Sequence, residues 1–161
     1  MSHKNFDSLR KAILAKTKKG MKEEVLPNYI EDLMWKATKE EVYDVWNPTK
    51  YKRREENGGL LDRDNIRGKV LKSKSNGFTF KVENIARTNF ESAISPRIYL
   101  APLVIMGKKN IDKSNVPARY NYWQGAEIYS YGEDRDFIGE TKNNLDKSKI
   151  AQKLDNYMRK T

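Results

Sequence analysis

Acidic residues close together are the strongest candidates for chemistry in this 161-residue sequence, and they occur in two places. Asp62 and Asp64 form a pair, and Glu133, Asp134 and Asp136 form a second group. Carboxylates at such spacings are typical of a magnesium site or of a carboxylate pair used in acid–base chemistry. Both groups also lie among arginines, so surface ion pairs worth about 0–1 kcal/mol each explain them better.

Other reactive groups are scarce. The sequence contains no cysteine, which excludes disulfides, thiolate nucleophiles and Cys-based zinc or iron–sulfur sites. Its one histidine, His3, lies near the N-terminus, where chains fray, so no histidine-based triad or metal site is expected. Gly58 and Gly59 lack the spacing and the Lys-Ser/Thr of a phosphate-binding loop. The sequence therefore predicts a protein that is not an enzyme and that binds no cofactor or metal.

The composition favours association with other chains. Apolar residues make up 37% of the sequence, against about 45–50% in an average globular protein, so the subunit has a thin core and oligomerisation is expected. The net charge of +10 favours polyanions or acidic protein surfaces as partners. The longest uncharged run, residues 98–107, contains Pro102 and is shorter than the ~20 residues of a membrane span. No secretion signal is apparent, and a cytoplasm-like compartment without membrane contact is expected.

Two stretches interleave basic and aromatic residues, which is a weak signal for nucleic-acid binding. They are residues 51–54 and residues 119–123. Neither is accompanied by a helix-turn-helix, a zinc finger or an RNP-like pattern, and aromatic side chains of this kind are more often core or interface anchors. A small basic nucleic-acid-binding protein, with nonspecific and salt-sensitive binding, therefore stays as the alternative function of another class.

The first third of the chain has the periodicity of a long amphipathic helix, because apolar residues recur at steps of three and four. Those residues are Phe6, Leu9, Ile13, Met21, Val25, Leu26, Ile30, Leu33, Met34 and Ala37. Gly20 and Pro27 interrupt the pattern, so either one helix kinks near Pro27 or a second helix begins there. The helix is expected to end by Trp46, because the residue before Pro48 is disfavoured in a helix.

A loop and a hairpin are predicted next. Residues 51–65 are charged and rich in glycine, as is typical of a loop. The Asn-Gly dipeptide at 76–77 is the strongest short hairpin signal, and Phe78, Phe80 and Val82 then alternate with polar residues. One face of this hairpin should be buried and the other should be solvated.

Residues 86–127 are interpreted as a long irregular excursion. Its apolar run, residues 98–106, is expected to be a buried strand interrupted at Pro102, with an apolar loop docking on a neighbour as the alternative. Residues 128–131 are a candidate for a last strand. The C-terminal segment again has helical periodicity, and Ser148 is the candidate N-cap of its final part.

The order of these elements predicts a single α+β domain over residues 1–161. It has a long N-terminal amphipathic helix, an antiparallel β-sheet built around a central hairpin, and a C-terminal helix. The helical arm covers residues 1–46, the loop and sheet cover residues 47–131, and the C-terminal helix covers residues 132–161.

Two stretches carry a family resemblance. The first places an aromatic, a proline and a Tyr-x-Arg where the N-terminal helix ends and closes with Gly and Leu; its residues are Trp46, Pro48, Tyr51, Arg53, Gly59, Leu60 and Leu61. The second opens the C-terminal helix and contains Arg135, Phe137 and Thr141. Together they resemble the head–tail joining family of tailed bacteriophages, also described as neck or tail-completion proteins. Asp136 stands where that family usually has Pro, and residues 86–127 do not match it.

The resemblance implies a non-catalytic structural virion protein that is assembled in the bacterial host cytoplasm. Identical subunits, six or twelve of them, would form a homo-oligomeric ring in the neck of the virion. This ring would join the portal and adaptor proteins of the DNA-filled head to the tail terminator or tail tube. A tail terminator or a minor capsid component is the alternative within the same class. The positive charge is expected to face an acidic protein surface, with nonspecific contact to passing DNA as the alternative, because a strongly cationic channel would retain DNA.

A closed ring needs two different patches on each subunit, and the long helix and the apolar middle segment are the candidates. The assembly candidates in the two motifs are Trp46, Pro48, Tyr51, Arg53, Arg54, Gly58, Gly59, Arg135, Phe137 and Thr141. The candidate docking segment contains Ile98, Tyr99, Leu100, Leu103, Val104, Ile105 and Met106, with Tyr120, Tyr122 and Trp123. Reversing Arg53 and Arg54 to Glu is expected to impair joining of heads to tails and to leave the subunit folded.

Overall fold

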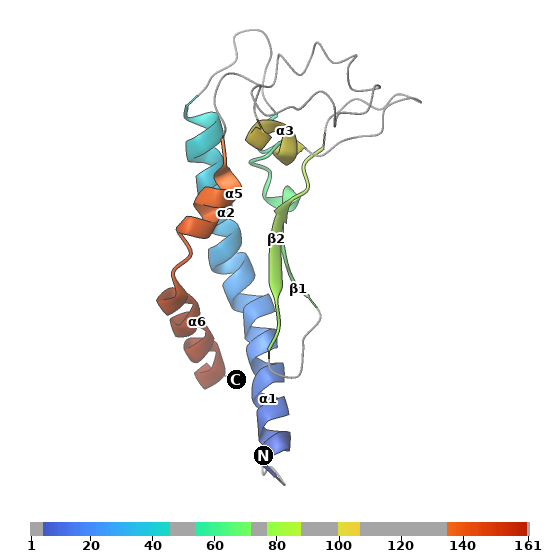
Figure 1. Ribbon diagram of the computed structural model, residues 1–161, viewed down its shortest axis with the longest axis vertical. Helices are drawn as coiled ribbons and strands as arrows, with labels where there is room; N and C mark the ends of the chain where they lie inside the picture. Colours follow the sequence, from blue (N-terminus) through green and yellow to red (C-terminus); the bar gives the residue numbers. More distant parts are fainter. Residues whose placement is uncertain (1–4, 46–53, 72–76, 88–99, 107–134, 161) are drawn as a thin grey trace, which may run out of the picture.

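The computed structural model describes residues 5–45, 54–71, 77–87, 100–106 and 135–160 (Figure 1). In chain order its elements are α1 (Phe6–Gly20), η1 (Met21–Ile30), α2 (Glu31–Thr38), η2 (Lys39–Tyr43), η3 (Arg63–Asn65), β1 (Ile66–Val70), β2 (Phe80–Asn84), α3 (Leu100–Met106), α5 (Phe137–Asn143) and α6 (Lys147–Lys160). The α+β class, the long N-terminal helix, the hairpin and the C-terminal helix are thereby confirmed.

The first four helical elements follow one another without a break and form a single rod (Figure 1). A capping box starts it: the Asn5 side chain accepts a hydrogen bond from the backbone N–H of Ser8 at 2.8 Å, and the Ser8 hydroxyl accepts one from the Asn5 N–H at 3.4 Å. The rod ends at Tyr43, where the Asp44 N–H still bonds to the Lys39 carbonyl at 2.9 Å. The predicted end before Trp46 is therefore correct.

Pro27 lies inside the rod and does not divide it into two helices. Proline lacks an N–H, and in an α-helix its ring clashes with the carbonyl four residues back. The surrounding element η1 is a π-helix, in which N–H groups bond five residues back, as the Glu31 N–H does to the Leu26 carbonyl. This wider turn displaces the carbonyl that would meet the ring, so the helix passes through Pro27.

The sheet has two antiparallel strands, β1 and β2, whose register runs from Ile66 opposite Asn84 to Val70 opposite Phe80. Side chains of Phe78, Phe80 and Val82 pack on the rod, while Thr79, Lys81 and Lys69 are exposed on the other face. The predicted alternation of a buried and a solvated face is confirmed. Of the predicted Asn-Gly turn, only Gly77 is among the described residues.

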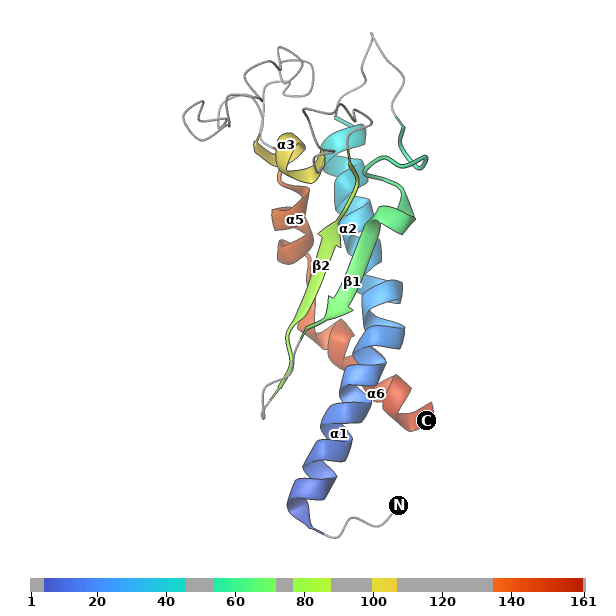
Figure 2. The ribbon, with the colours of Figure 1, turned by 90° about the vertical axis from the view of Figure 1, so that its right-hand side faces the viewer.

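Helix η1 is buried on opposite sides, because the sheet covers one side and α6 with its connection to α5 covers another (Figures 1 and 2). Met21, Val25, Leu26 and Ile30 are all buried there. Gly68 of β1 permits the close approach of the sheet: a Cβ at this position would lie 2.8 Å from Glu31 Oε1 and 3.0 Å from Leu26. In the same place the Gly68 N–H donates to Glu31 Oε1 at 2.7 Å.

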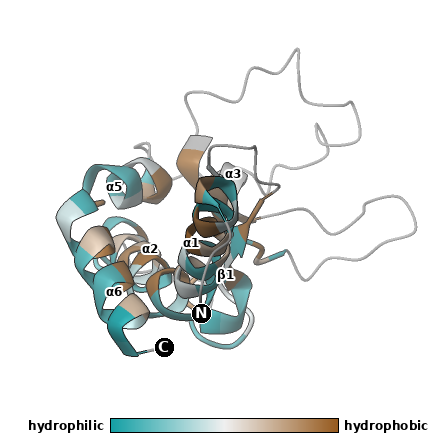
Figure 3. Cartoon of the chain, turned by 90° about the horizontal axis from the view of Figure 1, so that it is seen from below, coloured by the Kyte–Doolittle hydropathy of each residue, from teal (hydrophilic) through white to brown (hydrophobic). Residues whose placement is uncertain are grey.

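Helix α6 runs back across α1 toward the N-terminal end of the rod (Figures 1 and 2). The crossing is at Gly20, where a Cβ would lie only 2.7 Å from the Tyr157 ring. Polar contacts flank it: Lys16 Nζ donates to the Met158 carbonyl at 2.9 Å, and Lys153 Nζ contacts Glu24 Oε1 at 3.2 Å. Figure 3 shows that α6 is otherwise largely hydrophilic. The helix therefore binds the rod along a narrow seam.

Two predictions about secondary structure are wrong. Residues 100–106 form the helix α3 instead of a strand. Pro102 is the third residue of this helix, and the first four N–H groups of an α-helix have no partner within the helix. The missing N–H of proline is therefore tolerated there, and Pro102 marks the start of a helix instead of interrupting a strand. The N-cap of α6 is Asp146, not Ser148, because Asp146 Oδ1 accepts from the Ser148 N–H at 2.8 Å and from its hydroxyl at 2.6 Å.

Candidate functional site

The first motif continues into the loop between the rod and β1. The structure describes this loop from Arg54 onward. Its backbone takes positive φ angles at Glu55 (47°) and Gly58 (77°). Gly58 is suited to this angle, because glycine has no Cβ to clash. At Gly59 the requirement is space: a Cβ would lie 2.5 Å from the Glu55 carbonyl oxygen. Leu60 and Leu61 then return to the core, where both are buried.

Asp62 organises this loop from inside. Its Oδ2 accepts from the Gly58 N–H at 2.7 Å, and its Oδ1 accepts from the Asp64 N–H at 3.0 Å. The Asn65 side chain adds a donor to the Gly59 carbonyl at 3.0 Å. The expectation that surface ion pairs explain the Asp62–Asp64 pair is therefore wrong for Asp62, whose carboxylate holds backbone N–H groups.

Asn84, at the end of β2, connects the sheet to the loop. Its buried side chain donates to the Leu60 carbonyl at 2.7 Å and accepts from the Ala86 N–H at 3.0 Å. The Ile85 N–H donates to the Asn65 carbonyl at 2.7 Å, one step further along the same edge. Because the side-chain bonds lie out of water, they fix the loop more firmly than exposed contacts would.

Trp35 and Arg63 attach the loop to the rod. Trp35 Nε1 donates to the Leu61 carbonyl at 3.0 Å, and the Arg63 guanidinium lies 5.0 Å from the centre of the Trp35 ring. Arg63 also pairs with Asp32 at 2.5 Å. Both members of that ion pair are substantially exposed, so the pair contributes about 1 kcal/mol or less. The buried contacts, rather than the ion pair, determine where the loop lies.

Arg54 makes a contact within the subunit. Its Nη2 donates to the Arg87 carbonyl at 2.6 Å, beyond the end of β2. This arginine therefore closes the loop onto the sheet in addition to any role at the surface.

The second motif lies against the same end of the rod. Phe137 is completely buried, and the Thr141 hydroxyl donates to the Phe137 carbonyl at 2.6 Å inside α5. Asp136, where the family that the sequence resembles has Pro, accepts from the Gly139 N–H at 2.8 Å and caps the helix. The sequence predicts a surface ion pair for Asp136, whereas the structure shows its carboxylate as a helix cap. Phe137 and Thr141 are core residues of the subunit rather than parts of its surface, so the expectation that they form an assembly contact is not supported in this subunit.

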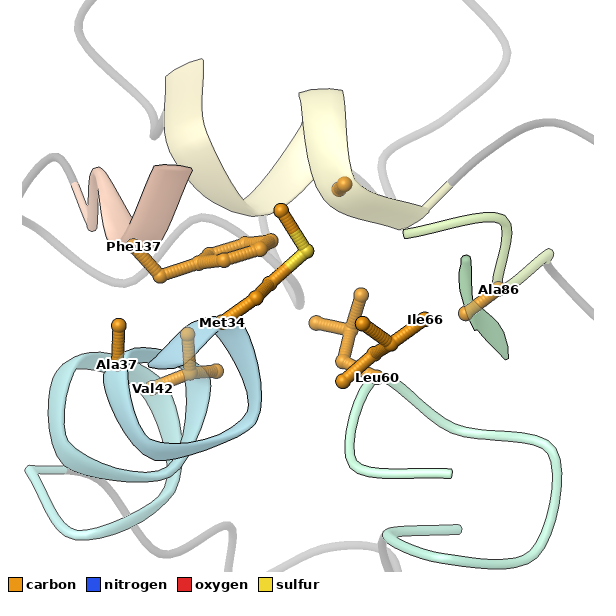
Figure 4. Packing of buried hydrophobic residues seen from close by; sticks show 8 residues of the cluster. Met34, Ala37, Val42, Leu60, Ile66, Ala86 and Phe137 are labelled. Carbon is orange, nitrogen blue, oxygen red and sulfur yellow. The ribbon is translucent and has the colours of Figure 1, made fainter. Parts of the chain in front are cut away.

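The described part of the first motif meets the second motif in one hydrophobic cluster (Figure 4). Leu60 from the first and Phe137 from the second pack with side chains of α2 and η2. The cluster contains Met34, Ala37, Val42, Leu60, Ile66, Ala86, Ala101 and Phe137. The half-buried Leu100, Val104 and Ile105 of α3 pack against it, so these members of the predicted docking segment contact the subunit's own core.

Several predicted site residues lie outside the described residues. They are Trp46, Pro48, Tyr51, Arg53, Ile98, Tyr99, Tyr120, Tyr122 and Trp123. Leu103 and Met106 belong to α3, and Arg135 is half-buried just before α5. Asn84 and Trp35 were not singled out in the sequence. Asp62 was singled out only as a member of an acidic pair, although an Asp shortly after a Gly-Gly turn is a recognisable signal of a capped loop.

Electrostatic perturbations lie away from this loop. Hydrogen bonds from Ser148 lower the pKa of Asp146 at the start of α6. A hydrogen bond from Lys69, with a second from Lys81, lowers the pKa of Glu83 on the solvated face of the sheet. The hydrogen bond to Glu23 raises the pKa of Tyr157 where α6 crosses the rod. Each shift belongs to a structural contact on the surface.

Chemically, the loop is an arrangement of backbone groups held by side chains. Among residues that the structure describes, no group of three or more His, Cys, Asp or Glu is placed to hold a metal ion. Within the same residues, no helix is long and apolar enough to cross a membrane. What the loop offers is a fixed shape at one end of the rod.

Residues 5–160 match a family model described as YomN. No curated protein matches the chain, and no solved structure matches it.

Proposed function

The chain belongs to the YomN family, and we propose that it is a non-catalytic structural protein of a tailed-phage virion. Its subunits form a homo-oligomeric ring in the neck that joins the DNA-filled head to the tail. Support for this proposal comes from the two motif stretches and from the surface of the subunit, and not from the description of the family.

The observation that carries the proposal is that the described part of the first motif, residues 59–61, lies with the second motif at one end of the rod. Leu60 and Phe137 are 77 positions apart in the sequence and pack in the same cluster beneath the loop. Both motifs therefore shape the same part of the subunit. The loop of residues 54–65 follows the rod and is fixed by hydrogen bonds of Asp62 and Asn84; we call this loop and the cluster beneath it the joint.

A rigid joint suits a subunit whose output is a contact. Assembly from identical subunits requires surfaces that are preorganised, because each side chain or loop ordered on binding costs free energy. The loop meets that requirement through the buried bonds of Asn84 and the tight backbone at Gly59. Portal or adaptor proteins on the head side and the tail terminator or tail tube on the other are the partners that this function requires.

The experiment is to inactivate the gene in the phage that carries it and to image the lysate. The proposal predicts DNA-filled heads and separate tails, with infectious particles restored by the wild-type chain. A chain with Arg53→Glu and Arg54→Glu should restore far fewer particles than a chain with Lys147→Glu and Lys149→Glu, which makes the same charge change on α6. Because Arg54 also bonds to the Arg87 carbonyl, Arg53→Glu alone, matched by Lys149→Glu, separates a lost surface contact from a loosened loop. Normal virions from the inactivated phage would refute the function.

One observation favours a second candidate, nonspecific nucleic-acid binding. Both α1 and α6 contain five lysines and arginines and one aspartate, and they lie side by side at one end of the molecule (Figure 1). A mobility-shift titration with duplex DNA separates the two functions. Dissociation constants tighter than about 1 μM at physiological salt exceed the usual nonspecific range and would favour the nucleic-acid function.

A further inference from the structure

The N-terminal turns of α1 project beyond the rest of the described molecule (Figures 1 and 2). They carry an apolar stripe of Phe6, Leu9 and Ile13, which are 78%, 38% and 46% exposed. The spacing places these side chains on one face of the helix, and continuing that spacing leads to Gly20, where α6 packs. The stripe therefore lies on the same face of α1 that binds α6, in the turns that α6 does not cover.

This projecting end is basic. We call residues 6–19 the basic tip; it contains Arg10, Lys11 and three further lysines against Asp7 alone, and of these lysines Lys16 bonds to the Met158 carbonyl of α6. The capping box at Asn5 keeps it helical to its first turn. Two basic tips repel each other, so the stripe is not suited to pairing with the stripe of a second copy. The basic charge favours an acidic partner surface, and the apolar stripe favours an apolar side chain on that surface.

The opposite end of the same rod has those properties. We call residues 40–45 the acidic end; it carries Glu40, Glu41 and Asp44, and its Val45 is 64% exposed. Lys39 is the nearest basic residue of η2. The rod thus has opposite charges at its two ends. Three exposed apolar side chains lie beside the basic charge, and one, Val45, lies beside the acidic charge.

We infer that the basic tip of one subunit docks on the acidic end of the next copy, so that unlike ends of neighbouring subunits meet. This inference rests on the proposed ring and specifies the interface between its subunits. Phe6, Leu9 and Ile13 are covered in this contact beside Val45 of the neighbour. Charge complementarity selects the partner and the orientation, and the apolar side chains supply the burial.

A contact between unlike surfaces gives a closed ring or an open filament, depending on the rotation between subunits. The rod from Phe6 to Tyr43 is about 55 Å long. For opposite ends of neighbouring rods to meet, the rods must lie around the circumference or be strongly tilted. Rods parallel to the ring axis would instead place basic tips beside one another.

The test uses the full chain and two charge reversals, measured by sedimentation velocity over a range of concentrations at about 50 mM salt. One variant carries Arg10→Glu and Lys11→Glu, and the other carries Glu40→Lys and Asp44→Lys. Each is expected to weaken self-association by about tenfold or more. An equimolar mixture of the two should associate again, because each reversed end then finds an opposite charge on the other variant.

Lys147→Glu with Lys149→Glu is the matched control, since it makes the same charge change at exposed positions of α6. It should associate like the wild type. A third variant replaces Phe6, Leu9 and Ile13 with Gln, which is a good helix former. Self-association should be lost while the thermal midpoint of the subunit stays unchanged, because the three side chains are exposed.

The outcomes separate the contact from the ring. A wild-type chain that assembles equally well with either charge reversal overturns the contact and leaves the ring in place. Open filaments that respond to the reversals support the contact and contradict the ring. A wild-type chain that stays a single subunit at all concentrations contradicts both. If the reversal at the basic tip abolishes binding to duplex DNA or to anionic vesicles but leaves self-association unchanged, the tip binds that partner and the inference is wrong.

Discussion

Replacing Asn84 with Ala tests whether the joint is held from inside. The side chain donates to the Leu60 carbonyl at 2.7 Å and accepts from the Ala86 N–H at 3.0 Å. Leu60 and Ala86 are both buried, so water does not replace either bond in the variant. A buried polar group without a partner costs about 1–3 kcal/mol, and two such groups give about 2–6 kcal/mol of lost stability.

In a chain of this size, a loss of 1 kcal/mol lowers the melting temperature by about 2–4 °C, so Asn84→Ala should lower it by roughly 4–24 °C. Thermal unfolding followed by circular dichroism measures this shift. Asn57→Ala is the matched control, because Asn57 is exposed in the same loop and should change stability by less than about 0.5 kcal/mol. An Asn84→Ala protein that melts within 1–2 °C or so of the wild type would refute the reasoning that this side chain anchors the loop.

Other predictions concern the two motifs and α6. Gly59→Ala should destabilise the protein in denaturant unfolding, because the new Cβ would lie 2.5 Å from the Glu55 carbonyl, whereas Gly77→Ala meets nothing within 4 Å and should not clash. Phe137→Ala should cost about 3–5 kcal/mol, because the ring is completely buried; a smaller loss than 1 kcal/mol or so would mean that α5 is not packed as described. The pKa of Asp146 is lowered in the folded state, so its stabilising effect is present above the ordinary aspartate pKa of about 3.9 and is lost as the pH falls through the lower folded value. Asp146→Asn should therefore flatten the acid limb of the stability–pH profile, and an unchanged limb would argue against the cap.

Periodicity was sufficient to predict the long helix and the hairpin. Apolar steps of three and four identify a helix whether its N–H groups bond four or five residues back. Leu26 and Ile30 therefore indicate the rod but not the π-helical form of η1. Likewise, the alternation of Phe78, Phe80 and Val82 gives the buried face of β2.

The errors have a common physical cause, which is that short segments do not show which backbone groups their side chains meet. A seven-residue apolar run suits a strand or a helix, and Pro102 fits either a strand break or a first helical turn. Asp146 and Ser148 are both good caps, and only the chain geometry decides which one accepts the N–H groups. Asp62 similarly has arginine neighbours in sequence and backbone N–H partners in space.

The candidate site was predictable in its position and not in its contacts. The loop that follows the long helix was predicted from its composition, and the structure describes it from Arg54 onward, but Asn84, which is 24 positions from its partner Leu60, carries no local signal. Phe137 and Thr141 were expected at an assembly surface and are instead buried against α2. A motif in a single sequence does not distinguish residues that shape a surface from residues that form it.

The most direct test of the central claim is to count this protein in purified virions. Quantitative mass spectrometry of intact particles, referenced to a capsid protein of known copy number, gives the copies per particle. A neck ring predicts a small fixed number, six or twelve, that stays with the particle after washing in high salt. Its absence from the particles, or a copy number in the hundreds, would contradict the account.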